Sequence, residues 1–105
     1  GLWAQPRLQE AGGGLRAPGD SVTLSCRGSG FNFDYHDIWW YRQAPAASLE
    51  WVSFISTASS VNKCAPAIEG RVLVSRDNSA SESSLSLSVL GPHDSARYFC
   101  AISHG

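Results

Sequence analysis

The sequence predicts an all-β fold in which two antiparallel sheets pack face to face as a sandwich. Apolar and polar residues alternate in short runs, most cleanly at residues 84–88. Residues that favour turns separate these runs roughly every 8–12 residues, which is typical of a sandwich. Helical periodicity never extends over ten residues. Two cysteines, Cys26 and Cys100, frame the alternating segments, and Trp40 lies between them.

The expected strands follow one another along the chain with turns between them. Glycines at 12–14 break the first strand, where they favour a bulge or a crossing between sheets. Val22, Leu24 and Cys26 alternate with polar residues, so this second strand buries one face. Further strands are expected at residues 71–76, 84–88 and 97–100, and turns at residues 17–20, 44–48, 77–79 and 91–94.

Length and composition fit one globular domain. The chain has 105 residues, of which 43% are hydrophobic and 16% charged, so it is not a disordered chain. We expect the domain to span residues 5–105, and residues 1–4 to be a leader remnant or a cloning scar. Net charge is −1 and Lys63 is the only lysine, which disfavours nucleic acid as a partner. No apolar run is long enough for insertion of this domain into a membrane.

Enzyme chemistry finds little support in the sequence. His36 lies close to Asp34 and Asp37, but no nucleophile elbow or oxyanion-hole motif accompanies them. His93 is most simply a turn residue at the base of the sandwich. The cysteines and histidines lack the spacing of metal ligands. We therefore predict a protein that is not an enzyme and that uses neither a cofactor nor a metal.

The pattern around the cysteines resembles that of a known family. Cys26, Trp40 and Cys100 have the spacing of an immunoglobulin variable-type domain, and Tyr98 precedes the second cysteine by two residues. Further stretches match the same pattern in order and spacing: residues 8–15, 25–26, 30–31, 40–45, 49–52, 69–71, 75–79 and 94–101. Taken together, the chain resembles an antibody heavy-chain variable domain from about residue 5 to residue 101, which implies a V-type sandwich with Greek-key connections.

The resemblance implies a core built around one disulfide. Cys26 should pair with Cys100, Trp40 should pack on the bridge, and Tyr98 should form a tyrosine corner by bonding upstream backbone. Closing a loop of about 75 residues would stabilise the fold by roughly 4 kcal/mol in a chain-entropy model. A structural disulfide implies an oxidising compartment, so we expect a secreted protein or a cell-surface ectodomain.

Other positions carry implications for the base and the edge of the sandwich. Arg71 and Asp94 match an ion pair that closes the base. Ser83 stands where such domains usually have a core aliphatic residue, which predicts slightly loose packing there. The given sequence ends at Gly105, before the final strand of the family pattern, so we expect either that the sequence is recorded incompletely or that a partner supplies this strand.

By resemblance, three loops at one end should contact antigen, expected to be a protein or glycoprotein. The first is near residues 32–37, the second spans residues 54–63, and the third begins at residue 102. Tyr35 would offer a large, stiff contact area, and the serines of the second loop would offer adaptable hydrogen bonds. Phe31 and Phe33 are expected to be packed loop anchors. The acidic first loop either suits a basic or polar epitope or consists of solvated residues without a special role. The predicted contact residues are Asn32, Asp34, Tyr35, His36, Asp37, Phe54, Ser56, Thr57, Ser59, Ser60, Asn62, Lys63, Ile102, Ser103 and His104.

A second surface is implied for an antibody light-chain variable domain. Tyr41, Gln43, Leu49, Trp51 and Phe99 match the positions that meet it, and Leu49 and Trp51 would leave an apolar patch on a lone domain. Two alternatives stay open at this stage. One is an autonomous single-domain binder, in which a tyrosine at position 41 also occurs, and the other is the V-type ectodomain of a receptor or adhesion protein.

Cys64 is left over from the expected disulfide. It either bridges to a cysteine of the third loop beyond this sequence or stays a partly buried thiol, and pairing between molecules is a third possibility. Residues 62–64 also form an Asn-x-Cys triplet, a rare and inefficient acceptor for glycosylation.

Overall fold

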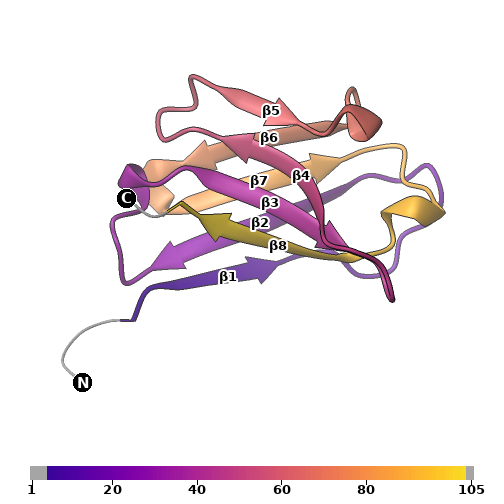
Figure 1. Cartoon of the computed structure of the whole chain (residues 1–105), viewed down its shortest axis with the longest axis horizontal. Coiled ribbons are helices and arrows are strands. Elements are labelled where there is room, and N and C mark those ends of the chain that lie inside the picture. The colour runs from indigo at the N-terminus through magenta and orange to yellow at the C-terminus, as the bar shows by residue number, and fades with distance from the viewer. Residues whose placement is uncertain (1–4, 104–105) are drawn as a thin grey trace.

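The computed structural model describes residues 5–103 as a sandwich of two four-stranded antiparallel sheets (Figure 1). Sheet A has the order β1-β2-β7-β6, and sheet B has the order β5-β4-β3-β8. The strands of sheet A are β1 (Arg7–Ala11), β2 (Val22–Ser29), β7 (Glu82–Leu87) and β6 (Val72–Asp77). Those of sheet B are β5 (Asn62–Cys64), β4 (Glu50–Ile55), β3 (Ile38–Gln43) and β8 (Arg97–Ile102).

The chain passes between the two sheets three times, as the predicted Greek-key sandwich requires. It crosses from sheet A to sheet B after β2, returns after β5, and crosses again after β7. Single turns of 3-10 helix lie in the connections, and two of them coincide with the turns predicted at residues 77–79 and 91–94. These turns are η1 (Phe33–Tyr35), η2 (Pro66–Ile68), η3 (Asn78–Ala80) and η4 (Pro92–Asp94). The predictions for residues 1–4 and for His104 concern positions outside the described residues.

The core lies between the sheets and is centred on one indole ring. Trp40 of β3 is fully buried and pairs in register with Cys100 of β8. Cys100 is disulfide-bonded to Cys26 of β2, so the bridge joins the two sheets as the resemblance implied. The remaining core side chains are Phe33, Ile38, Val52, Ile55, Ile68 and Leu85.

The structure does not show the loose packing that was expected at Ser83. Its side chain is fully buried between the sheets, and its hydroxyl accepts a hydrogen bond from Trp40 Nε1 at 3.2 Å. The same hydroxyl donates to the backbone oxygen of Ser75 at 2.8 Å. A buried indole N–H without an acceptor would be costly, so a small hydroxyl serves this position better than an aliphatic side chain. The residue holds the central tryptophan in place.

Asp94 stands at the centre of an ionic cluster at the base of the sandwich. The predicted pair with Arg71 is present and bidentate, with N···O distances of 2.9 and 3.0 Å. Sequence reasoning missed Arg42, which is buried in β3 and also donates to Asp94 at 2.9 Å. Arg42 is further paired with Glu50 at 2.6 Å. The cluster therefore neutralises a buried guanidinium with two carboxylates, as burial of a charge requires.

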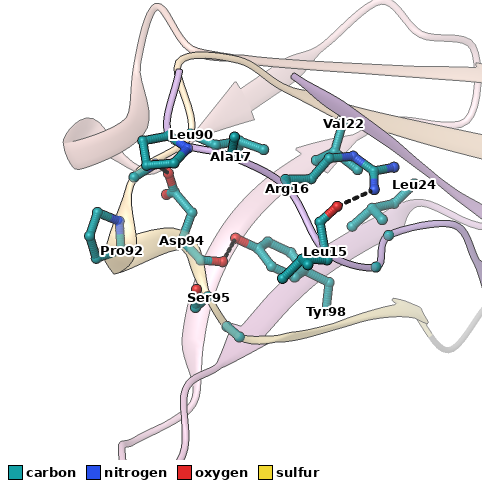
Figure 2. Close-up of a pocket in the computed structure, with 15 residues that line it drawn as sticks. Leu15, Arg16, Ala17, Val22, Leu24, Leu90, Pro92, Asp94, Ser95 and Tyr98 are labelled. Carbon is teal, nitrogen blue, oxygen red and sulfur yellow. Dashed lines mark hydrogen bonds between the residues drawn. The ribbon is translucent and has the colours of Figure 1, made fainter. Parts of the chain in front are cut away.

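Tyr98 completes this base. Its hydroxyl donates to the backbone oxygen of Asp94 at 2.8 Å, which is the expected tyrosine corner (Figure 2). The same hydroxyl accepts a hydrogen bond from Arg42 at 3.1 Å. Burial raises the pKa of Tyr98, while the hydrogen bond from Arg71 is the main cause that holds the pKa of Asp94 at about 2.

The outer edge of β8 has no neighbouring strand within residues 5–103. One N–H on this edge, that of Cys100, instead donates to the Glu10 carboxylate at 3.1 Å.

Candidate functional site

Three connections meet at one end of the sandwich (Figure 1). They are the β2–β3 connection with η1, the β4–β5 turn, and the chain that leaves β8. In the first of them Phe33 is buried and lies 6.3 Å from Phe31, so both act as the packed anchors that were expected. Asn32, Asp34 and Tyr35 are exposed, and Tyr35 keeps 74% of its surface accessible. Tyr35 is therefore the most prominent side chain of the first loop.

Arg76 of β6 links the first two loops to the sandwich by hydrogen bonds to their backbones. Its guanidinium donates to the backbone oxygens of Phe33 at 2.9 Å and Ser56 at 3.0 Å, and lies over the Phe33 ring at 4.8 Å. Asn78 receives a bond from Arg76 and donates to the backbone oxygen of Thr57 at 2.9 Å. Burial lowers the pKa of Arg76 below its ordinary value. Neither Arg76 nor Asn78 was identified from sequence as a site residue, although Arg76 lies on the same inward face of β6 as Val72 and Val74.

A second set of bonds links the first loop to the second loop and to the chain that follows β8. The Asp37 carboxylate accepts from the backbone N–H of Thr57 at 3.1 Å. The backbone N–H of Asp37 donates to the Ser103 hydroxyl at 3.3 Å. Nδ1 of His36 lies 2.7 Å from the Ser103 carbonyl oxygen, which can only accept, so this nitrogen carries the hydrogen. His36 and Asp37 are thus half-buried structural links. The alternative that the polar residues of the first loop (Asp34, His36 and Asp37) are solvated and without a special role is therefore wrong for these two.

The second loop is shorter than predicted. Phe54 is a residue of β4, and Asn62 and Lys63 belong to β5. The loop proper is a tight turn in which the Ser56 hydroxyl accepts from the backbone N–H of Val61 at 3.0 Å. Ser59 adopts a φ of 63°, in the left-handed region that turns require. Ser59 and Ser60 are exposed, whereas Ser56 and Thr57 are half-buried.

Of the third predicted loop, the described part of the chain includes only Ile102 and Ser103. Ile102 is the last residue of β8 and packs against the core, so it is not the exposed contact residue that was predicted. It shares the inward face with Ile38, its partner in register. Ser103 is half-buried and held by His36 and Asp37.

The outer face of sheet B carries the predicted light-chain residues together. Tyr41, Trp51 and Phe99 occupy outward positions of three adjacent strands and are half-buried. Gln43 is exposed, and its side-chain amide donates to the backbone oxygen of Ala47 at 2.9 Å. Leu49 precedes β4 and keeps 55% of its surface accessible. These five residues are defined here as the sheet B patch.

Trp39 extends the aromatic surface of the sheet B patch toward the loops, and sequence reasoning missed it. Its ring lies 4.6 Å from that of Phe54, its partner in register on β4. Both side chains are half-buried on the outward face, since Trp39 alternates with the buried Ile38 and Trp40. This alternation was the signal available in the sequence. The pair lies between the sheet B patch and the loop end.

Cys64 is a half-buried thiol without a disulfide partner among the described residues. It pairs in register with Ser53, whose buried hydroxyl has no hydrogen-bond partner there. Within residues 5–103 no group of three or more His, Cys, Asp or Glu side chains could hold a metal ion. In the same range no helix has the length and apolar character needed to cross a bilayer.

Comparison with known families agrees with this geometry. The model of the immunoglobulin V-set domain matches residues 15–105, which is most of the chain. A V-set domain stapled by an internal disulfide is typical of extracellular proteins. The fold, the bridge around Trp40 and the loop arrangement all fit that assignment. The chain therefore belongs to the immunoglobulin V-set family, a non-enzymatic family.

Proposed function

We propose that this domain binds antigen as the heavy-chain variable domain of an antibody, paired with a light-chain variable domain. The observation that carries the proposal is the aromatic and apolar outer face of sheet B, which runs up to the loop end. Such a protein is secreted or displayed at the cell surface, and it binds without making or breaking a covalent bond. Its antigen would be a protein or glycoprotein.

The sheet B patch supports the light-chain part of this proposal. Aromatic side chains are enriched in interface cores, and Tyr41, Trp51 and Phe99 lie side by side on three strands. Leu49 adds an exposed aliphatic side chain at their margin. Exposed apolar patches of this kind usually mark protein interfaces. A standard interface of about 1,600 Å² in total would cover this face.

The loop end supports the antigen part. Tyr35, Ser59 and Ser60 are exposed there, and they provide a rigid aromatic contact and flexible hydrogen-bonding groups. Beneath them, Arg76 and Asp37 hold the loop backbones through bonds of 2.9 to 3.1 Å. Such preorganisation lowers the entropic cost of binding. The site is therefore a stiff support for variable contacts.

The decisive experiment titrates the chain with a panel of recombinant light-chain variable domains. We expect a one-to-one complex by analytical ultracentrifugation, and its loss in Leu49→Arg. A buried arginine at the edge of the patch should cost more than 2 kcal/mol of binding free energy, or roughly 30-fold in Kd. Leu73→Arg is the matched control, because Leu73 is also exposed but lies on sheet A.

The outcomes separate the proposal from its rivals. Weakening by Leu49→Arg and not by Leu73→Arg supports pairing through the sheet B patch. A chain that stays a stable monomer with every light-chain domain would contradict the pairing and indicate a domain that binds alone. Equal weakening by both variants would show that the contact does not use the patch.

A further inference from the structure

Asn62 and Cys64 lie two residues apart on β5, the outermost strand of sheet B (Figure 1). With Lys63 between them they form an Asn-x-Cys triplet, whose middle residue is not proline. Carbohydrate is attached to asparagine in Asn-x-Ser or Asn-x-Thr, where the third side chain supplies a hydrogen-bonding hydroxyl. A thiol is a weaker donor and acceptor than a hydroxyl, so it can serve in the third position at lower efficiency.

The side chain of Asn62 is free to carry a bulky group. It is exposed, and its amide makes no hydrogen bond within residues 5–103. The side chain of Asn78, by contrast, is held by hydrogen bonds on both of its polar atoms. Neither Asn32 nor Asn78 has a serine, threonine or cysteine two residues later, so Asn62 is the only asparagine of the sequence in such a triplet.

The position of Asn62 directs an attached glycan away from the sheet B patch. Asn62 pairs in register with Ile55, and Lys63 with Phe54. Ile55 is buried toward sheet A, whereas Phe54 lies on the outward face with the patch. Since residues opposite each other in a sheet share a face, the Asn62 side chain leaves on the side turned away from the patch. On its other side β5 has no neighbouring strand within residues 5–103, which leaves room for carbohydrate.

The thiol that the triplet needs is available. Cys64 has no disulfide partner in the described part of the chain, where Cys26 and Cys100 are joined to each other. A sulfur in a disulfide would have no S–H to donate, so only the free thiol can complete the triplet. The bridge between the other two cysteines requires an oxidising compartment such as that of secretion, in which asparagine-linked glycans are also added.

We propose that Asn62 is a site of asparagine-linked glycosylation at the margin of sheet B. The co-substrate is an oligosaccharide linked to a lipid pyrophosphate, and the membrane-bound transferase of the secretory pathway acts on the nascent chain. A bond forms between Asn62 Nδ2 and the anomeric carbon of the first sugar, and the bond from that carbon to the pyrophosphate oxygen breaks. The amide gives up one proton to a base of the transferase, and the lipid pyrophosphate leaves with the electron pair.

The test expresses the 105-residue chain behind a secretion signal in mammalian cells. The intact mass of the reduced chain is measured in the cell lysate and in the medium, before and after treatment with peptide N-glycosidase F. We expect a fraction of the chains to carry the mass of an oligosaccharide, which the enzyme removes while leaving an aspartate at the acceptor position. Cys64→Thr keeps the acceptor and replaces the thiol by a hydroxyl, so it should raise the glycosylated fraction by about twofold or more.

Three further variants locate the glycan. Asn62→Gln and Cys64→Ala should each abolish it, the second without touching the acceptor amide. Asn32→Gln is the matched control and should leave the glycosylated fraction unchanged, because Asn32 is exposed but lies outside the triplet. Since transfer takes place on the nascent chain, the lysate reports glycosylation even for a variant that is not secreted.

The outcomes are distinct from those of the pairing experiment, because neither a light chain nor an antigen takes part. An unmodified mass for the whole population of the native chain, in the lysate and in the medium alike, would overturn the proposal. A glycan that persists in Asn62→Gln or in Cys64→Ala would overturn it as well, since the carbohydrate would then be attached elsewhere or without the triplet.

Discussion

We expect Asp94→Asn to remove the ion pairs at the base of the sandwich while leaving the size and shape of this side chain almost unchanged. The carboxylate is almost fully buried and accepts four hydrogen bonds, three from guanidinium groups and one from the backbone N–H of Gly91. The amide keeps the volume but loses the charge, so Arg42 would retain only Glu50 as an anionic partner. Breaking a buried pair by removing one partner typically costs about 3–5 kcal/mol. Because Arg71 is partly exposed, we expect a loss of about 2–4 kcal/mol in the free energy of unfolding at pH 7.

The pKa of Asp94 gives the expected pH dependence. The hydrogen bond from Arg71 is the main cause that lowers this pKa from 3.8 to about 2 in the folded protein. A depressed pKa stabilises the fold above the unfolded value, and the contribution is lost as the pH falls through the folded value. The shift corresponds to about 2 kcal/mol, present above pH 4 and lost progressively toward pH 2.

Urea unfolding followed by tryptophan fluorescence measures both effects. The stability difference between the native protein and Asp94→Asn should shrink by about 2 kcal/mol between pH 5 and pH 2. Asp34→Asn is the control, because Asp34 is exposed in the β2–β3 connection. That connection lies at the opposite end of the sandwich from the turn that precedes β8 (Figure 1). A loss below about 0.5 kcal/mol at pH 7, in the range of ordinary surface substitutions, would refute the structural role of the cluster. A difference that does not depend on pH would refute the assigned cause.

Two more substitutions test the core and the loop supports. Ser83→Val should lower the free energy of unfolding by about 1–3 kcal/mol, because Trp40 Nε1 loses its acceptor; a rise in stability would instead show that the position is loosely packed. Arg76→Met should speed amide exchange in residues 31–36 and 56–60, since the backbone oxygens of Phe33 and Ser56 lose their donors. Unchanged exchange there would show that the loops are held by other contacts.

The fold could be predicted because its main determinants are local patterns with fixed spacing. Alternation in β2 and β7 assigned their inward faces, and the structure keeps those assignments. The positions of Cys26, Trp40 and Cys100 relative to one another then specified how the two sheets meet. The tyrosine corner was predicted from the family resemblance, because Tyr98 precedes the second cysteine by two residues in the sequence.

The candidate site was harder to predict because it depends on contacts between distant segments. In the sequence, nothing distinguishes Arg42 from an exposed strand arginine. Its burial beside Asp94 becomes evident only from the structure, in which it lies opposite Tyr98 and Glu50. Ser83 was misjudged because a family preference for aliphatic residues cannot show which buried donor needs an acceptor.

The predicted loop boundaries were wrong for a related reason. Phe54 and Ile102 were assigned to loops by resemblance, yet both pair in register with β3 and so belong to strands.

Peptide mapping of the non-reduced protein tests the architecture most directly. After alkylation of free thiols and proteolysis, the fragments containing Cys26 and Cys100 should remain joined, and Cys64 should carry the label. Recovery of Cys64 in a bridge with either of the other two cysteines of the same molecule would contradict the sandwich built around Trp40, along with the placement of the loop end and of the sheet B patch.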